Sequence, residues 1–138
     1  MNEKWCKYTR RYEGLSVMPY QCPRGHLTIG YGHNLEHGIS KEMADFILQQ
    51  DMTLAEKSVS KQFLWWKKLN EVRQYVLVDM CFNMGINKLC YFKKMLSAVQ
   101  RGDYQTAAAE MINSRWASQV GYRAIELAKM MKTGVYDD

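Results

Sequence analysis

The stretch YEGLSVMPYQCPRGHLTIGYGHN, residues 12–34, changes from helical to strand periodicity within a few residues. Up to Glu13, aromatic residues recur at helical spacing, at Trp5, Tyr8 and Tyr12. Asn2 is a typical helix N-cap, and Gly14 is typical of a helix end. Within the second half of the stretch, the turn-rich CPRGH is followed by LTIGYGH, which alternates larger and smaller side chains. We therefore predict a helix that ends near Glu13, followed from Pro19 onwards by a hairpin with one face nearly bare of side chains.

Helical patterns occupy the rest of the chain. Ser40 is a plausible N-cap for a helix that runs to about Ser58, with an apolar stripe made by Met43, Phe46, Ile47 and Leu54. The segment LNEVRQYVLVDMCFNMG, residues 69–85, has Asn70 as N-cap and is apolar nearly all round, which is typical of a buried central helix. Three further helices are expected over residues 92–100, 103–113 and 121–132. The C-terminal half is therefore predicted to be a helix bundle.

Length and composition indicate one folded domain. The chain has 138 residues, and 19 Lys and Arg against 14 Asp and Glu give it a net charge of +5. This excess favours an anionic partner, such as an acidic membrane surface or a charged cell-wall polymer, and its even spread does not single out nucleic acid. We find no apolar run long enough to cross a bilayer and no signal peptide. The cysteines have no metal-ligand spacing, and a bridge between Cys81 and Cys90 stays open.

Three side chains in residues 12–34 suit the cleavage of a glycan. This chemistry needs an acid to protonate the leaving oxygen, a group across the sugar to hold or activate water, and an open wall. Glu13 can supply the acid. Cys22 opens the hairpin turn, and Thr28 would point from the face that the glycines leave bare. Because those glycines lack Cβ atoms, a ligand could approach the backbone closely.

The spacing of these residues resembles the signature of phage lysozymes, the muramidases of glycoside hydrolase family 24. That signature is a Glu, eight residues, an Asp or sometimes Cys, five residues, a Thr, and then Ile-Gly-x-Gly-His. Glu13, Cys22, Thr28 and TIGYGH meet it at every spacing. The similarity continues in family order through LQQDM, CFNMGI, SRWASQVGYRA and KTGVYD, so it covers nearly the whole chain.

The resemblance implies an α+β, lysozyme-like fold. A small N-terminal lobe with a β-hairpin or short sheet would be joined by a long helix to a C-terminal helical bundle. We expect one domain over residues 1–138. Its hairpin lobe and linking helix would span about 13–58, and the helical lobe would combine residues 59–138 with the N-terminal helix 2–12.

The resemblance also implies roles for individual residues. Glu13 would be the proton donor, Cys22 its catalytic partner, and Thr28 would hold the attacking water. Positions that contact the glycan in the family correspond to Asn34, Phe82, Met95 and Glu110. Positions that support the site correspond to Arg123, which would pair with the catalytic Glu, and to Asp51, which would pair with His33.

Cys22 is the main departure from an acidic catalytic partner. A thiol has an ordinary pKa about four units above that of a carboxylate, so it is mostly uncharged near neutral pH unless its surroundings favour the thiolate. If Cys22 acts as a thiolate, Arg24 or His26 could lower its pKa. If it acts as a thiol, it would only orient water.

The expected activity is hydrolysis of the β-1,4 bond between N-acetylmuramic acid and N-acetylglucosamine in peptidoglycan, with inversion as the resemblance implies. We expect a monomer that uses no metal or cofactor, binds no nucleic acid and does not insert stably into a membrane. It would be made in the host cytoplasm and reach the wall through a membrane lesion made by another, holin-type protein.

Two other functions stay open from the sequence. The first is a catalytically silent peptidoglycan-binding module, with Cys22 marking the loss of activity. The second is a cysteine peptidase that pairs Cys22 with His26 or His33. Trp65 and Trp66 could stack on sugars, but packing between lobes is the favoured interpretation. Trp116 is interpreted as a core residue. Phe82 lies near the cleft in relatives, but a buried helix residue is the simpler interpretation.

Overall fold

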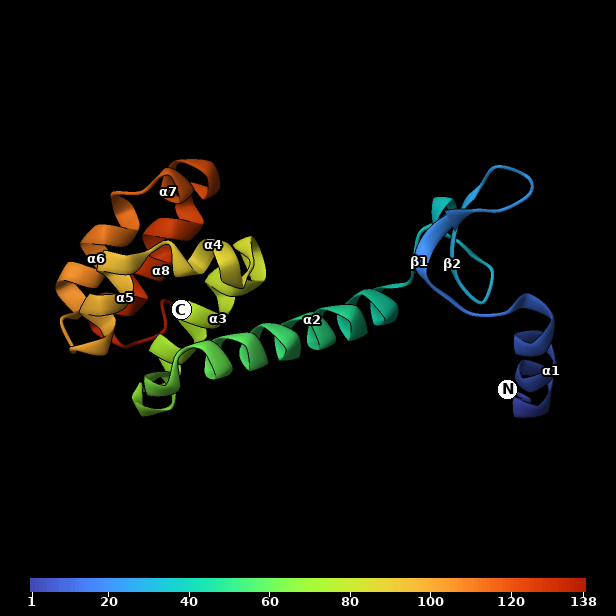
Figure 1. Ribbon diagram of the computed structural model, residues 1–138, viewed down its shortest axis with the longest axis horizontal. Helices are drawn as coiled ribbons and strands as arrows, with labels where there is room; N and C mark the ends of the chain where they lie inside the picture. The colour runs from blue at the N-terminus through green and yellow to red at the C-terminus, as the bar shows by residue number, and fades with distance from the viewer. The chain divides into compact units, whose positions relative to one another are not determined.

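The computed structural model describes residues 1–138, and its helices and strands are labelled in Figure 1. The chain divides into two compact units, Met1–Phe46 and Ile47–Asp138, which are described separately here. The boundary falls within α2, a single helix over Lys41–Gln62. The mixed α+β class predicted from the sequence is confirmed, while the division into lobes at residues 13–58 and 59–138 stays a prediction.

Helix α1 of the first unit spans Glu3–Glu13, as its sequence pattern predicts. The side chain of Asn2 accepts a hydrogen bond from the backbone N–H of Lys4 at 2.9 Å, which satisfies one unpaired N–H group of the first turn. At the other end, the N–H of Gly14 donates to the carbonyl of Arg10, and Gly14 has φ of +72°. Glu13 is therefore the last residue of the helix.

A three-stranded antiparallel sheet follows, in the order β1 (Ser16–Gln21), β2 (Leu27–Gly30) and β3 (His33–Asn34). The prediction of a hairpin from Pro19 was therefore incomplete, because β1 begins earlier and LTIGYGH contributes to two strands. Gly30 and Gly32 have φ of +71° and +83°, which ends β2 and turns the chain into β3. A short 3₁₀ helix, η1 (Leu35–His37), closes the region.

Helix α2 begins as predicted and ends later than predicted. The hydroxyl of Ser40 accepts a hydrogen bond from the N–H of Met43 at 3.1 Å, so Ser40 caps the helix. The helix continues to Gln62 instead of stopping near Ser58. Its buried residues are Ala55 and Val59, whereas the expected apolar stripe over Met43, Phe46, Ile47 and Leu54 is exposed.

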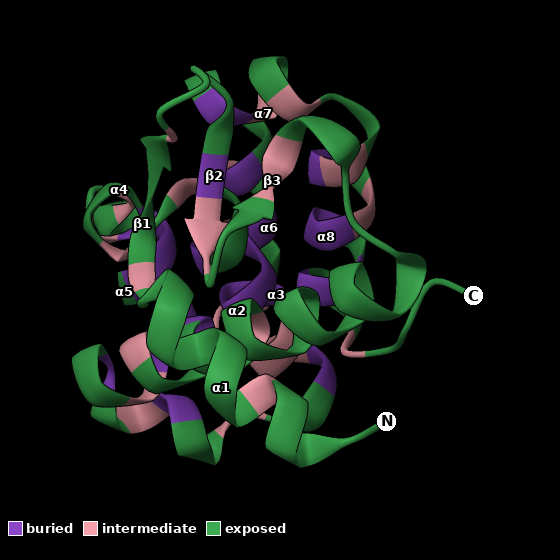
Figure 2. Cartoon of the chain, turned by 90° about the vertical axis from the view of Figure 1, so that its right-hand side faces the viewer, coloured by how far each residue is buried: buried purple, intermediate pink, exposed green.

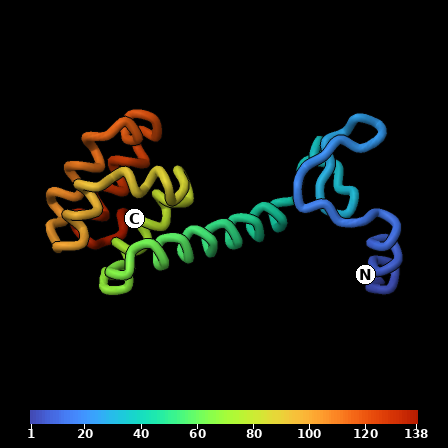
Figure 3. The backbone as a smooth tube through the Cα atoms, viewed as in Figure 1, coloured from blue at the N-terminus to red at the C-terminus, as the bar shows by residue number.

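The second unit is a helix bundle, as predicted (Figures 1 and 3). Its helices after α2 are η2 (Leu64–Lys68), α3 (Glu71–Met84), α4 (Ile86–Cys90), α5 (Lys93–Gln100), α6 (Tyr104–Ile112), α7 (Arg115–Val120) and α8 (Tyr122–Thr133). The helices predicted over 92–100, 103–113 and 121–132 are confirmed as α5, α6 and α8. The prediction missed α4 and α7, which have only 5 and 6 residues and are too short to show an apolar period.

The core of the second unit surrounds α3, as Figure 2 shows by the purple, buried faces of its helices. Seven residues of α3 are buried, and Val76, Leu77 and Met80 have no exposed surface. Trp66 and Trp116 are also buried, so the prediction that Trp116 is a core residue is confirmed. Phe82 is 38% exposed, so its interpretation as a buried helix residue was wrong.

All four cysteines are free thiols, so Cys81 and Cys90 do not form a bridge in this structure. Burial raises the pKa of the Cys81 thiol, and the nearby Cys90 adds to the effect. None of the helices combines the length and the apolar character that a bilayer crossing requires.

Candidate active site

Glu13 lies against the turn between β2 and β3. A Cβ atom added to Gly32 would stand 2.8 Å from Oε2 of Glu13 and 3.1 Å from its Cδ. The carboxylate of Glu13 therefore occupies the space that a side chain at position 32 would need. The same test at Gly30 finds no atom within 4 Å. The face that the sequence predicts to be bare is therefore covered by Glu13 at Gly32 and is open at Gly30.

Cys22 and Thr28 are joined through one backbone carbonyl. The N–H of Cys22 donates to the carbonyl oxygen of His26 at 2.9 Å, and the hydroxyl of Thr28 donates to the same oxygen at 2.8 Å. The carbonyl of Cys22 accepts from the N–H of Gly25 at 2.8 Å, which closes the turn of CPRGH. Thr28 is 4% exposed and is the one buried residue of the first unit.

The hydroxyl of Thr28 has a restricted role in this arrangement. Because its proton is committed to the His26 carbonyl, the oxygen can only accept a further hydrogen bond, for example from water. A hydroxyl fixed in this way can orient a water molecule without rotating.

The surroundings of Cys22 favour the thiolate. Hydrogen bonding to the backbone of His26 lowers the pKa of the Cys22 thiol most, and the backbone of Arg24, the hydroxyl of Thr28 and the charge of His26 lower it further. Desolvation opposes these effects and is outweighed. Of the two groups considered from the sequence, His26 acts chiefly through its backbone and least through its charge, and Arg24 acts through its backbone.

His26 is itself paired with Glu36, which the sequence analysis did not single out. Nδ1 of His26 lies 2.8 Å from Oε2 of Glu36 on η1. Glu36 raises the pKa of His26, chiefly through this hydrogen bond, and His26 lowers the pKa of Glu36 in return. The only sequence signal was the presence of an acid and a base on neighbouring segments.

The other two site residues of the first unit lie on β3. Asn34 stands opposite Thr28 in the sheet, so the sheet brings this expected glycan-contacting residue beside the hairpin that carries Cys22 and Thr28. Its side-chain oxygen accepts from the N–H of Glu36 at 2.9 Å and caps η1. Nε2 of His33 lies 3.0 Å from the carbonyl oxygen of Gly38.

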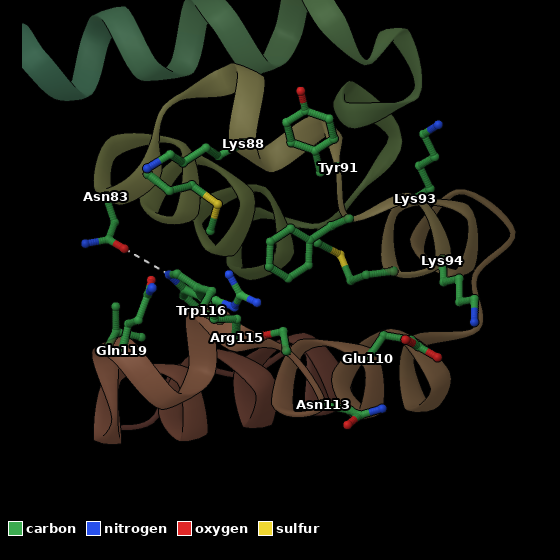
Figure 4. A pocket seen from close by; sticks show the side chains of 15 residues that line it. Asn83, Lys88, Tyr91, Lys93, Lys94, Glu110, Asn113, Arg115, Trp116 and Gln119 are labelled. Atoms are coloured by element: carbon green, nitrogen blue, oxygen red, sulfur yellow. Dashed lines mark hydrogen bonds between the residues drawn. The ribbon is translucent and has the colours of Figure 1, made fainter.

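The second unit contains a pocket of about 990 Å³ between α3–α5 and α6–α7 (Figure 4). Its lining combines amides, cations and aromatic rings, among them Asn83, Lys88, Tyr91, Arg115, Trp116 and Gln119. In Figure 4, Lys88 and Tyr91 lie on one wall and Arg115 and Gln119 on the opposite one. Nε1 of Trp116 donates to Oδ1 of Asn83 at 2.9 Å, which joins α7 to α3. Such a mixture of groups can recognise a polar ligand with apolar faces.

Two of the expected glycan-contacting residues line this pocket, and one does not. Met95 and Glu110 belong to the lining, although Met95 is 1% exposed and contributes only to the wall. Phe82 is not among the lining residues. The remaining lining residues were not predicted individually, but several fall in CFNMGI and SRWASQVGYRA, the segments that carried the resemblance.

Arg123 is held by Asp79 in the second unit. Nε and the second guanidinium nitrogen of Arg123 donate to the two carboxylate oxygens of Asp79 at 2.9 and 2.8 Å. This bidentate pair raises the pKa of Arg123. The expected pairs of Arg123 with Glu13 and of Asp51 with His33 join residues of different units, and they stay predictions.

Comparisons with known proteins indicate the family of this chain. The family model for phage lysozyme matches residues 10–131, which include Glu13, Cys22 and Thr28. The chain is 25% identical to "Probable T4-type lysozyme 1" of Dictyostelium discoideum, over 88% of this chain and 89% of that protein. It is 31% identical to "Endolysin" of Acyrthosiphon pisum secondary endosymbiont phage 1, over 85% of this chain and 80% of that protein.

A third relative is much longer than this chain. The "Pre-baseplate central spike protein Gp5" of Enterobacteria phage T4 is 28% identical over 96% of this chain but only 28% of its own length. The matched segment thus also occurs inside a larger protein. Because the family model covers most of the sequence and the relatives align over nearly its whole length, the chain belongs to the phage lysozyme family and is a glycoside hydrolase.

Proposed function

We propose that the chain hydrolyses the β-1,4 bond between N-acetylmuramic acid and N-acetylglucosamine in peptidoglycan, with Glu13 as general acid. One observation carries the proposal: an acid, a thiol and a hydroxyl all lie on or against the turns and strands of one small sheet. Cys22 and Thr28 share the carbonyl of His26, and the turn that follows β2 carries the glycine against which Glu13 lies.

In the proposed reaction Glu13 donates its proton to the glycosidic oxygen as the bond from that oxygen to the anomeric carbon breaks. A water molecule held by Thr28 attacks the anomeric carbon from the opposite face, which inverts its configuration. Cys22 accepts the proton that this water loses. Exchange with solvent then returns the proton to Glu13 and removes it from Cys22.

The thiolate form of Cys22 fits this role better than the neutral thiol. A neutral thiol can orient water but cannot accept its proton, nor can it stabilise the positive charge that develops on the sugar. The surroundings of Cys22 lower its pKa, which supports the charged form.

The pocket of the second unit supports binding of a polysaccharide that carries peptide and acetamido groups. Amide side chains can pair with acetamido groups, aromatic rings can cover sugar faces, and the lysines and arginine suit carboxylates. We propose that Asn34, Phe82, Met95 and Glu110 contact the glycan around the scissile bond. The net charge of +5 helps the protein to concentrate on an anionic wall.

We further propose that the biological role is lysis of a bacterial host at the end of phage multiplication. The relative named an endolysin supports this role. The protein would accumulate in the host cytoplasm as a monomer and reach the wall when a separate, holin-type protein permeabilises the membrane.

Hydrolysis is tested with the purified chain on bacteria whose outer barrier has been permeabilised. We expect a fall in turbidity, together with reducing N-acetylmuramic acid ends in the digest by mass spectrometry. Glu13→Gln should lower the rate by about 10²- to 10⁴-fold, the usual contribution of a general acid. Glu42→Gln is the matched control, because Glu42 is an exposed acid of the same unit with no side-chain hydrogen bond. Equal rates for the two variants would contradict the role of Glu13.

The role of Cys22 is tested by two substitutions. Cys22→Asp should keep activity, because a carboxylate is charged at neutral pH and can accept a proton, whereas Cys22→Ala should lose it. An alanine variant as active as the parent would show that the thiol is a bystander.

The same digest separates the other two candidate functions. Binding to the wall without any soluble product would indicate a silent binding module. Release of peptides without new sugar ends, blocked by a thiol reagent, would indicate a cysteine peptidase.

A further inference from the structure

The pocket of the second unit carries an excess of positive charge. Its lining includes four cations and one acid, Glu110, so its charged side chains give a net charge of +3. The cations come from three elements, α4, α5 and α7, and are Lys88, Lys93, Lys94 and Arg115. In Figure 4, Lys88 lies at one end of the pocket and Lys93 and Lys94 lie at the other, so positive charge borders the pocket at both ends.

These four charges do not hold the bundle together. The ion pairs of the second unit join Arg101, Arg123 and Lys129 to acids outside the pocket lining, and no pocket cation takes part in them. Lys93 and Lys94 also stand in the first turn of α5, which contains no acid, although the helix dipole favours negative charge there. The two lysines therefore weaken the free helix slightly, and an anion bound in the pocket would offset this cost.

The uncharged part of the lining favours a peptide as the anion. The pocket volume of about 990 Å³ lies at the upper end of the range usual for small-ligand sites, about 300–1,000 Å³. Asn113 and Gln119 add amide groups, and Asn83 offers its N–H groups to a ligand because its Oδ1 accepts from Trp116. A phosphodiester polymer has no peptide groups to pair with these amides. A peptide with carboxylates matches the amides and the cations together.

We propose that this pocket recognises the free carboxylates of the peptides that peptidoglycan carries, and that Lys93 and Lys94 make the chain selective for peptides whose carboxyl groups are not amidated. An amide has nearly the size of a carboxylate but no charge, so it leaves the lysines without an anionic partner. That the ligand is a wall peptide rests on the proposed function. The preference of the pocket for an anionic over a neutral peptide does not.

The test measures binding to the full chain with Glu13→Gln, so that the probe is not cleaved during the measurement. The probe is a soluble disaccharide of N-acetylglucosamine and N-acetylmuramic acid with its peptide, prepared once with free and once with amidated carboxyl groups. Calorimetry gives the dissociation constant of each form. An exposed ion pair contributes up to about fivefold in affinity, so the free form should bind about four- to twentyfold more tightly than the amidated form. Added salt should reduce this preference, because it screens exposed charges.

Two double variants of this chain separate the pocket from net charge. Lys93→Gln with Lys94→Gln should remove most of the preference for the free form and leave the affinity for the amidated form nearly unchanged. Lys67→Gln with Lys68→Gln is the matched control, because these are also adjacent exposed lysines and they lie on η2, outside the pocket lining. Equal binding of the two probes, or equal losses in the two double variants, would overturn the proposal. Tighter binding of a glycerol phosphate polymer of similar charge would also overturn it and assign the pocket to phosphates.

This result can be separated from the test of the hydrolase proposal, which measures new sugar ends with the unsubstituted chain. A chain that cleaves the wall but binds both probes equally would disprove only the selectivity. A chain that prefers the free form but releases no sugar ends would disprove only the hydrolase.

Discussion

Replacing Gly32 with alanine should reduce activity far more than it reduces stability. The new methyl group would stand 2.8 Å from Oε2 of Glu13, closer than such atoms approach one another, so the carboxylate must move. Gly32 also has φ of +83°, a region that costs a residue with a side chain about 1–2 kcal/mol. A displacement of about 1 Å in a catalytic group can cost about a hundredfold in rate, so we expect a loss of tenfold or more.

Gly30→Ala provides the matched control for this substitution. Gly30 has φ of +71°, so its alanine variant carries a similar backbone penalty. Its added Cβ would meet nothing within 4 Å, so Glu13 keeps its place. The difference between the two variants therefore isolates the contact with Glu13.

Both variants are compared by urea unfolding and by the rate at which reducing sugar ends appear in digested wall. We expect similar losses of stability and a much lower rate for Gly32→Ala. If Gly30→Ala lost as much activity as Gly32→Ala, backbone strain would explain both results. The inference that Gly32 sets the position of Glu13 would then be refuted.

Four further predictions concern the second unit, and urea unfolding measures each of them. Asp79→Ala should lower the free energy of unfolding by about 1–3 kcal/mol, because it leaves the guanidinium of Arg123 without its bidentate partner; no change would mean that water replaces the carboxylate at no cost. Leu77→Ala should cost about 2–5 kcal/mol, because Leu77 has no exposed surface. Leu64→Ala, at a residue 82% exposed, should change stability by less than about 0.5 kcal/mol. Asp103 caps α6, and its hydrogen bonds to Thr106 lower its pKa below 3.8, so its contribution is present above that value and is lost as the pH falls through the folded pKa. The stability of Asp103→Asn should accordingly fall less than that of the parent between about pH 5 and pH 2, and parallel curves would contradict this reasoning.

Most of the longer helices and several of their first residues were predictable because their causes are local. Asn2, Asn70 and Asp103 each accept a hydrogen bond from a backbone N–H two or three residues further on, so the capping residue and its partner lie in one short segment. The central helix was evident from apolar residues on every side of it. The spacing of Glu13, Cys22 and Thr28 likewise belongs to one stretch of sequence and could be compared directly with a family pattern.

Contacts between separate elements were decided only by the tertiary structure. The carboxylate of Glu13 takes the space left by Gly32, and Glu36 reaches His26 from another element. Asp79, 44 residues before Arg123, binds its guanidinium. The lining of the pocket likewise comes from α3–α7.

The physical reason is that the two kinds of interaction depend on different distances along the chain. A cap or an apolar period needs only the geometry of one or two helical turns, which the residue types themselves specify. A side-chain contact between distant residues needs the path of the whole intervening backbone, including its turns at glycines. The sequence by itself therefore determined most of the longer helices, the presence of a β region after Glu13 and the catalytic candidates, and the fold decided which neighbours surround those candidates.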